Sequence, residues 1–277
     1  DPEYPERTGR RRDGRDLIAQ WTAKSANHAF VWNREGFDAI DPQTSPRVLG
    51  LFEQSHMQYE LDRSADASGE PSLSDMTAKS IEILKRNRNG YLLVVEGGRV
   101  DHAHHASNAA RALKDMQAVS EAVATALEMT SIKDTLIIVT ADHGHTMSFA
   151  GYPRKGSPIL GLATASLEAG GDAQGFALAA DKKPYTTLSY ANGPGSVLLG
   201  DVSAGRPVLT QEQALDPAFR QPSLVPSGSE THGGQDVPIY AQGPRAHLFS
   251  GLVEQSYIYY VIEDALSLKK RAREGSR

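Results

Sequence analysis

Residues 91–105 read YLLVVEGGRVDHAHH, an apolar run followed directly by a cluster of acidic and histidine residues. Residues 135–145, TLIIVTADHGH, repeat that arrangement. Continuous apolar runs of this length are typical of strands in a parallel sheet that is covered on both faces. A long amphipathic helix is predicted between the two runs, over 107–129. Strand, helix and strand in this order predict an α/β fold.

The flanking sequence extends this alternation in both directions. A helix is predicted from Ser72 or Ser74, which can cap it, to about Asn87, with Gly90 as its stop. Residues 151–228 are rich in Gly, Pro, Ala and Ser, and their weak periodicity predicts an irregular excursion from the sheet. Further strands are predicted at 29–32, 47–52 and 237–240, and further helices at 13–26 and 257–270.

The composition limits the chemistry that the chain can support. Its 277 residues carry a net charge of −5, so the basic surface that nucleic-acid binders usually show is not expected. The sequence contains no cysteine, which excludes disulfides, thiolate metal ligands and a cysteine nucleophile. Any metal ion must therefore be held by His, Asp and Glu.

Two acidic and histidine clusters follow the two apolar runs. In open parallel sheets the functional crevice lies beyond the carboxyl ends of the strands, so we expect the clusters to converge. Asp101 and His105 are four residues apart, which places them on one face of a helix, where they can share a cation. Asp142 and His143 form a second mixed pair suited to zinc, and Glu96 suits magnesium.

A histidine-rich surface turn is the alternative interpretation of either cluster taken alone. The presence of two clusters at two strand ends, together with Glu-Thr-His-Gly-Gly at 230–234, favours a metal centre. The sequence has no His-Glu-x-x-His, which counts against a zincin protease.

These motifs resemble the alkaline phosphatases, most closely the animal-type enzymes. The resemblance covers nearly the whole chain, and its most specific segments are VEGGRVDHAHH (95–105), TADHGH (140–145), DKKPYTTLSYANGPG (181–195) and ETHGGQDVPIYAQGPRAHLFSG (230–251). It implies a three-layer α/β/α sandwich around a central, mostly parallel sheet. It also implies that the 277 residues correspond to the C-terminal half of such an enzyme, so that the sheet is incomplete. Residues 151–228 resemble the position of the family's interfacial insertion, the crown subdomain.

The resemblance also assigns metal ligands. It implies one zinc bound by Asp101, His105 and His232, a second zinc bound partly by Asp142 and His143, and a magnesium bound partly by Glu96. His102, His104 and His145 would orient these ligands from behind. A calcium site is implied at Glu3, the Phe52 carbonyl, Glu53 and Glu70.

The implied activity is hydrolysis of phosphate monoesters at alkaline pH through a phosphoserine intermediate. Phosphate monoesters and inorganic phosphate would be the ligands, the intact enzyme would be a homodimer, and the location would be extracytoplasmic: periplasmic, secreted or membrane-anchored.

The chain departs from the family pattern at the nucleophile. No Asp-Ser-Ala motif occurs in it, and the similar DVSAG at 201–205 lies in the irregular excursion. The phosphate-clamping arginine of the family is also missing, and Arg99 is interpreted as structural. The isolated chain is therefore expected to be inactive. The alternatives are a non-catalytic metal-binding fragment or a related metallohydrolase, such as a phosphodiesterase, a sulfatase or a phosphoglycerate mutase.

Overall fold

A computed structural model describes residues 8–45, 47–165, 171, 174–201, 203 and 205–275. They form two compact units. The first unit comprises the described residues up to Gly97, together with Gln117–Asp142 and the chain from Pro238 onward. The second comprises Gly98–Met116 and His143–Val237, so the helix α5 (Ala109–Met129) contributes to both.

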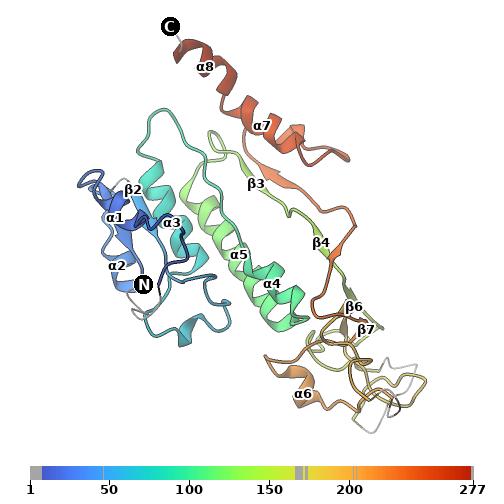
Figure 1. Cartoon of the computed structure of the whole chain (residues 1–277). Helices are drawn as coiled ribbons and strands as arrows, with labels where there is room; N and C mark the ends of the chain where they lie inside the picture. The colour runs from blue at the N-terminus through green and yellow to red at the C-terminus, as the bar shows by residue number, and fades with distance from the viewer. Residues whose placement is uncertain are drawn as a thin grey trace. The chain divides into compact units, whose positions relative to one another are not determined.

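The first unit contains a small parallel sheet and its covering helices. β1 (His28–Val31) pairs in parallel with β2 (Arg47–Gly50), and Figure 1 shows β2 grouped with α1 and α2. A hydrophobic core of Val31, Phe37 and Ile40 forms here. The remaining elements of this unit are α1 (Leu17–Thr22), α2 (Arg34–Asp38), η1 (Arg63–Ala65), α3 (Leu73–Leu84), β3 (Ile137–Val139), β9 (Tyr240–Gln242), η3 (Ala246–Leu248), α7 (Tyr257–Ala265) and α8 (Leu268–Gly275).

The helix α3 begins where the sequence predicts. The Ser72 hydroxyl accepts a hydrogen bond from the Asp75 N–H, and the Asp75 carboxylate accepts one from the Ser72 N–H, which completes a capping box. Ile81, on the inner face of this helix, is only 2% exposed. The cap fixes the start of α3, and the burial of Ile81 holds the helix in the first unit.

The second unit is built from short strands and short helices. Its elements are α4 (Arg99–His105), β4 (Gly144–His145), β5 (Met147–Phe149), β6 (Leu188–Gly193), α6 (Gln211–Leu215), β7 (Ser223–Pro226) and β8 (His232–Gly233). β6 lies between β5, which is antiparallel to it, and β7, which is parallel, and Figure 1 shows β6 and β7 side by side. β4 pairs with β8 in a separate two-stranded ladder. The excursion predicted for 151–228 thus contains β6, α6 and β7 within its irregular loops.

The α/β fold class is confirmed, because helices alternate with both parallel and antiparallel pairs. Within the described ranges the strands form four small sheets of two or three strands rather than one wide sheet. The strand predicted at 91–95 is wrong: these residues have no ladder partner among the described residues, and Leu92 and Val94 are 56% and 81% exposed. A strand without a neighbour has no hydrogen-bonded ladder to stabilise it.

The predicted helix boundaries also need correction. The helix expected at 257–270 is two helices, α7 and α8, separated at Ser267, where φ is 53°. The helix expected from residue 107 begins at Ala109, because Ser107 has φ of 55°. Among the helices of the described ranges, none is both long enough and apolar enough to cross a bilayer.

Candidate metal centre

α4 carries Asp101 and His105 on one face. As their spacing predicts, the two side chains meet, and the Asp101 Oδ1 and His105 Nε2 atoms are 3.3 Å apart. The helix ends at His105. Ser107, with a φ of 55°, separates α4 from α5, which begins at Ala109.

The short ladder between β4 and β8 brings in the other histidines. His145 lies directly opposite His232 in this antiparallel pair. Side chains of opposed residues lie on the same face of a ladder, so both rings are directed to the same side. The ladder thus joins two histidine motifs that are far apart in the sequence.

Three ligand atoms form a triangle of the size that a zinc site requires. The distances are 3.3 Å from Asp101 Oδ1 to His105 Nε2, 3.5 Å from Asp101 Oδ1 to His232 Nε2, and 3.2 Å between the two Nε2 atoms. Ligands at ~2.0–2.2 Å from a tetrahedral zinc ion lie about 3.3–3.6 Å from one another. A mixed set of one carboxylate and two imidazoles, with a fourth position left open, therefore fits zinc in both geometry and chemistry.

Asp101 provides a second indication of a cation site. Its Oδ1 atom is buried and has no hydrogen-bond partner among the described residues. A buried polar atom without a partner loses its hydration without compensation, and for a charged oxygen the cost is especially large. A cation bound within the triangle would satisfy this atom.

His143 lies against the same triangle. Its ring stacks on that of His232 with the centroids 3.5 Å apart, and its Nε2 is 3.8 Å from Asp101 Oδ1. Asp101, His143 and His232 thus form a further group whose ligand atoms lie within 4.8 Å of one another. The predicted ligand of a second ion therefore lies beside the predicted ligands of the first.

Glu96 and Asp142 belong to the first unit. Glu96 precedes the second unit by two residues in sequence, and Asp142 is bonded to His143. The main-chain carbonyl of Asp142 accepts a hydrogen bond from Gln255 Nε2 at 3.2 Å. The assignment of these two carboxylates to metal ions rests on the sequence motifs.

Glu230 binds the Nδ1 atoms of two histidine rings, those of His105 and His145. His105 Nδ1 lies 2.6 Å from the main-chain oxygen of Glu230, and His145 Nδ1 lies 2.7 Å from Oε2 of the Glu230 carboxylate. Both oxygens can only accept, so each Nδ1 donates its proton. In a neutral ring the opposite Nε2 atom then keeps its lone pair, which is the form that binds a metal ion.

Sequence reasoning did not assign a role to Glu230. It is 1% exposed, and burial alone would raise its pKa, but hydrogen bonds from Thr146 and His145 outweigh burial and lower the pKa. The carboxylate is therefore ionised. The only available signal was its place two residues before His232 in the Glu-Thr-His-Gly-Gly motif.

His104 contacts Tyr190 and His145. Its Nδ1 atom lies 2.8 Å from the Tyr190 hydroxyl, and its ring stacks on His145 with centroids 4.6 Å apart. Burial lowers the pKa of His104 to about 4 and raises the pKa of Tyr190. The neutral His104 ring thus backs His145, whereas the Nδ1 atom of His102 lies 3.4 Å from an Arg99 nitrogen.

A second cluster, in the first unit, consists of carboxylates alone. Glu53, Asp66 and Glu70 place ligand oxygens within 4.8 Å of one another. Glu70 accepts hydrogen bonds from the Gln58 N–H at 2.9 and 3.1 Å. Burial raises the pKa of Glu70 to about 7, with further contributions from the neighbouring charges of Asp66 and Glu53. Oxygen ligands suit calcium.

The other two residues predicted to bind calcium are Phe52 and Glu3. Phe52 precedes Glu53 and packs against the core of the first unit. Glu3 lies outside the described residues. Asp66, which the sequence did not single out, joins Glu53 and Glu70 without any motif that could have pointed to it.

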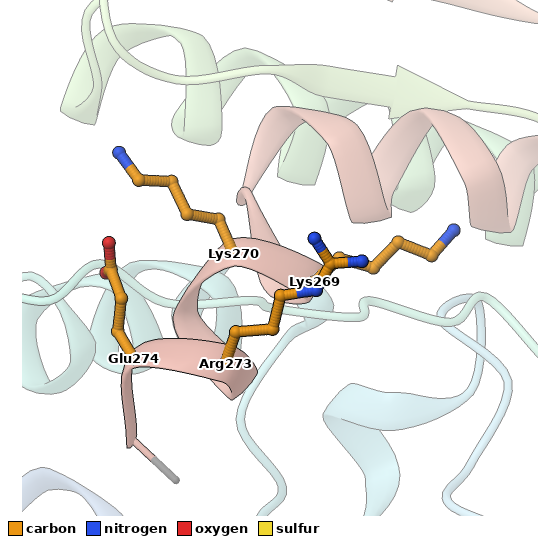
Figure 2. Close-up of a pocket in the computed structure, with 4 residues that line it drawn as sticks. All are labelled: Lys269, Lys270, Arg273 and Glu274. Atoms are coloured by element: carbon orange, nitrogen blue, oxygen red, sulfur yellow. The ribbon is translucent and has the colours of Figure 1, made fainter. Parts of the chain in front are cut away.

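Two further features, the turn at Asp201 and a hollow on α8, do not bring reactive side chains together. Ser203 donates a hydrogen bond to Asp201 at 2.6 Å on an exposed loop, as a local turn does. A hollow on α8 is lined by Lys269, Lys270, Arg273 and Glu274, but Figure 2 shows the amino groups of the two lysines directed apart. Lys269 is instead paired with Glu263 at 2.6 Å.

The sequence matches a family profile described as alkaline phosphatase over residues 1–268. The alkaline phosphatase of Gadus morhua is 39% identical over 259 residues, which are 93% of this chain and 51% of that protein. The tissue-nonspecific isozyme of Rattus norvegicus is 42% identical over 257 residues, 92% of this chain and 46% of that protein. The chain therefore spans about half the length of the curated relatives it matches.

Solved structures agree in fold. The cold-active alkaline phosphatase from the psychrophile Shewanella sp. matches with a TM-score of 0.57 and 25% identity, covering 93% of this chain and 64% of that one. The alkaline phosphatase from the Antarctic bacterium TAB5 matches with a TM-score of 0.56 and 18% identity, covering 93% and 56%.

Proposed function

Because the chain belongs to the alkaline phosphatase family, we propose that it provides the zinc-binding part of a hydrolase that cleaves phosphate monoesters. The observation that carries the proposal is the triangle of Asp101, His105 and His232, with its unsatisfied carboxylate oxygen. Bound zinc supplies positive charge to phosphate oxygens and lowers the pKa of a coordinated water or hydroxyl group.

The ligands divide into two zinc sites and one magnesium site. Asp101, His105 and His232 would hold the first zinc, with Asp142 and His143 contributing to the second. Glu96 would supply an oxygen to magnesium, which prefers oxygen ligands. The carboxylate of Asp101 offsets part of the charge of the cation, while the imidazoles contribute neutral nitrogen donors.

The nucleophile is the part of the chemistry that these residues do not provide. The family pattern places it in an Asp-Ser-Ala motif, and the 277 residues contain none. The isolated chain is therefore proposed to be inactive, and turnover through a phosphoserine at alkaline pH would need a serine from outside these residues. The extracytoplasmic location, the homodimer and the role of 151–228 as the interfacial subdomain belong to the same proposal.

A calcium ion would bind at the carboxylates of the first unit. Glu53 and Glu70, with the Phe52 carbonyl and Glu3, form the proposed ligand set. Asp66 lies within the same cluster and would add a further oxygen. Carboxylates this close repel one another, and a bound divalent cation would neutralise that repulsion.

Metal content after zinc loading and dialysis tests the main proposal. The wild-type chain is expected to keep about one tightly bound zinc through the first site, and the His105→Ala, His232→Ala double variant is expected to lose it. A His28→Ala, His247→Ala variant controls for loss of histidines outside the cluster and should retain the zinc. A folded wild-type chain that keeps no zinc would contradict the ligand set.

A second candidate, a metal-binding protein without catalysis, is favoured by the missing Asp-Ser-Ala motif. The two candidates differ when the N-terminal half of a family member is added to the zinc-loaded chain. Turnover of a chromogenic phosphate monoester would support the hydrolase, and the double variant should abolish it. Continued inactivity with zinc bound and the two halves associated would favour the second candidate.

A further inference from the structure

We propose that Glu230 is the positioning residue of this centre, holding the proposed ligand His105 with its Nε2 atom directed into the triangle and the neighbouring His145 with its Nε2 atom directed at Asp101. This inference rests on the proposed zinc function. It concerns how the chain prepares the site before any ion binds.

Glu230 contacts the two rings in different ways. Its main chain pairs with His105 twice: its N–H donates to the His105 carbonyl at 2.9 Å, and its own carbonyl accepts from His105 Nδ1 at 2.6 Å. Its side chain accepts from His145 Nδ1 at 2.7 Å. One residue thus fixes the tautomer of two rings whose Nε2 atoms lie 3.3 and 3.1 Å from Asp101 Oδ1.

Both oxygens of the Glu230 carboxylate accept hydrogen bonds in this arrangement. Its Oε1 atom accepts from the Thr146 N–H at 2.6 Å and from the Thr146 hydroxyl at 2.7 Å, while Oε2 serves His145. The side chain is completely buried. An ionised carboxylate can only accept hydrogen bonds, so His145 must present a protonated nitrogen to Glu230 Oε2. This hydrogen bond fixes the orientation of the His145 ring.

The same atoms exclude Glu230 as a metal ligand. Glu230, His105 and His145 place ligand atoms within 4.8 Å of one another, as a metal group does. However, the two rings present Nδ1 to Glu230, and these nitrogens already carry the protons of short hydrogen bonds. Metal-binding histidines commonly donate the other ring proton to a carboxylate or a carbonyl in this way.

Glutamine at position 230 would change the tautomer of His145 and leave that of His105 unchanged. The amide has a single acceptor oxygen, which the two Thr146 donors would retain, so its NH₂ would face His145 Nδ1. His145 must then accept there and carry its proton on Nε2, directed toward Asp101. His105 is bound by the main chain of residue 230, which the substitution leaves in place, so its tautomer should not change.

The test reads tautomers by ¹⁵N NMR of the metal-free, histidine-labelled chain at about pH 8, above the ordinary pKa of ~6.5 for a histidine in a peptide. The wild type should show His105 and His145 protonated on Nδ1, and Glu230→Gln should move only His145 to the Nε2–H form. Wild-type rings protonated on Nε2 would overturn the inference without the need for any variant. So would an unchanged His145 tautomer in a folded Glu230→Gln chain.

Zinc affinity, measured by competition with a chromogenic chelator, provides the second measurement. Glu230→Gln should bind zinc about 10–100-fold more weakly, because the proton on His145 Nε2 would then face Asp101 Oδ1, an oxygen of the triangle. The matched control is Thr187→Val, which removes a buried hydroxyl that has no hydrogen-bond partner in the described part of the second unit and should leave the affinity unchanged. Equal affinities of the wild type and Glu230→Gln would overturn the positioning role. Because the tautomers are read without metal, a wild type that binds no zinc would count against the proposed function alone.

Discussion

Replacing Glu70 with glutamine should remove a pH dependence of stability from the first unit. Glu70 is 3% exposed, and burial, followed by the charges of Asp66 and Glu53, raises its pKa from an ordinary 4.5 to about 7. Between these two pH values the folded chain holds a proton that the unfolded chain has released. The free energy of unfolding of the metal-free chain therefore falls as the pH rises from 4.5 to 7, and stays low above it.

The size of this effect follows from the shift. Each unit of pKa difference corresponds to ~1.4 kcal/mol, so the loss reaches about 3 kcal/mol once the folded-state carboxyl is ionised. Glutamine is uncharged at every pH and still offers one oxygen to the Gln58 N–H. Glu70→Gln should therefore be close to the wild type in stability at about pH 5 and more stable by up to about 3 kcal/mol at about pH 8.

His104 has the opposite pH dependence of stability, which the assay must separate from that of Glu70. The pKa of His104 is lowered from 6.5 to about 4, so its contribution to stability is present above pH 6.5 and is lost as the pH falls toward 4. His104 belongs to the second unit, whereas both tryptophans of the chain, Trp21 and Trp32, belong to the first. Tryptophan fluorescence during urea unfolding with a chelator present reports the unit that contains Glu70.

The control is Glu128→Gln, which changes an exposed carboxylate on the part of α5 that lies in the same unit. It should keep the wild-type difference between the two pH values. The reasoning fails if Glu70→Gln keeps that difference as well, because the carboxyl of Glu70 would then ionise as it does in the unfolded chain.

The same unfolding assay checks three further predictions. Calcium at a concentration of about 100 times its Kd should stabilise the wild type by about 2.7 kcal/mol near pH 8 and stabilise Glu70→Gln much less, whereas equal gains would place calcium elsewhere. Ile81→Ala should cost about 2–5 kcal/mol, since a 2% exposed side chain leaves a cavity, and a loss below 1 kcal/mol would contradict its core position. Ser72→Ala should cost about 1 kcal/mol by removing the cap of α3, and no change would mean that the capping box contributes nothing.

Local sequence signals predicted those elements whose stabilising contacts are local. Ser72, one of the two serines predicted to cap the helix, is the cap of α3, and the four-residue spacing of Asp101 and His105 predicted that their side chains would meet on one helix. Residues 91–95 show the opposite case. Their apolar run is typical of a buried strand, but a strand depends on a neighbour that the run itself does not encode.

The helix ends were missed for a related reason. Ser107 and Ser267 both have positive φ, which sequence patterns assign to Gly or Asn, so neither break was visible. Ser107 is completely buried, and its carbonyl accepts from the N–H of Gln221, more than a hundred residues later. The conformation of this serine is therefore supported by a distant segment of the second unit.

The candidate metal centre also combines features that local sequence predicts with features that depend on distant segments. The convergence of Asp101, His105 and His232 could be predicted because His, Asp and Glu in this pattern suit zinc chemistry, and two of the three residues lie on one short helix. The direction of their lone pairs could not, because it depends on Glu230, which meets His105 across 125 positions of sequence and His145 across 85. The two-residue ladder that sets His145 opposite His232 is too short to leave a periodic signal. A sequence can thus predict which side chains suit a metal ion, whereas a residue that orients them, as proposed for Glu230, is found only once distant segments are seen together.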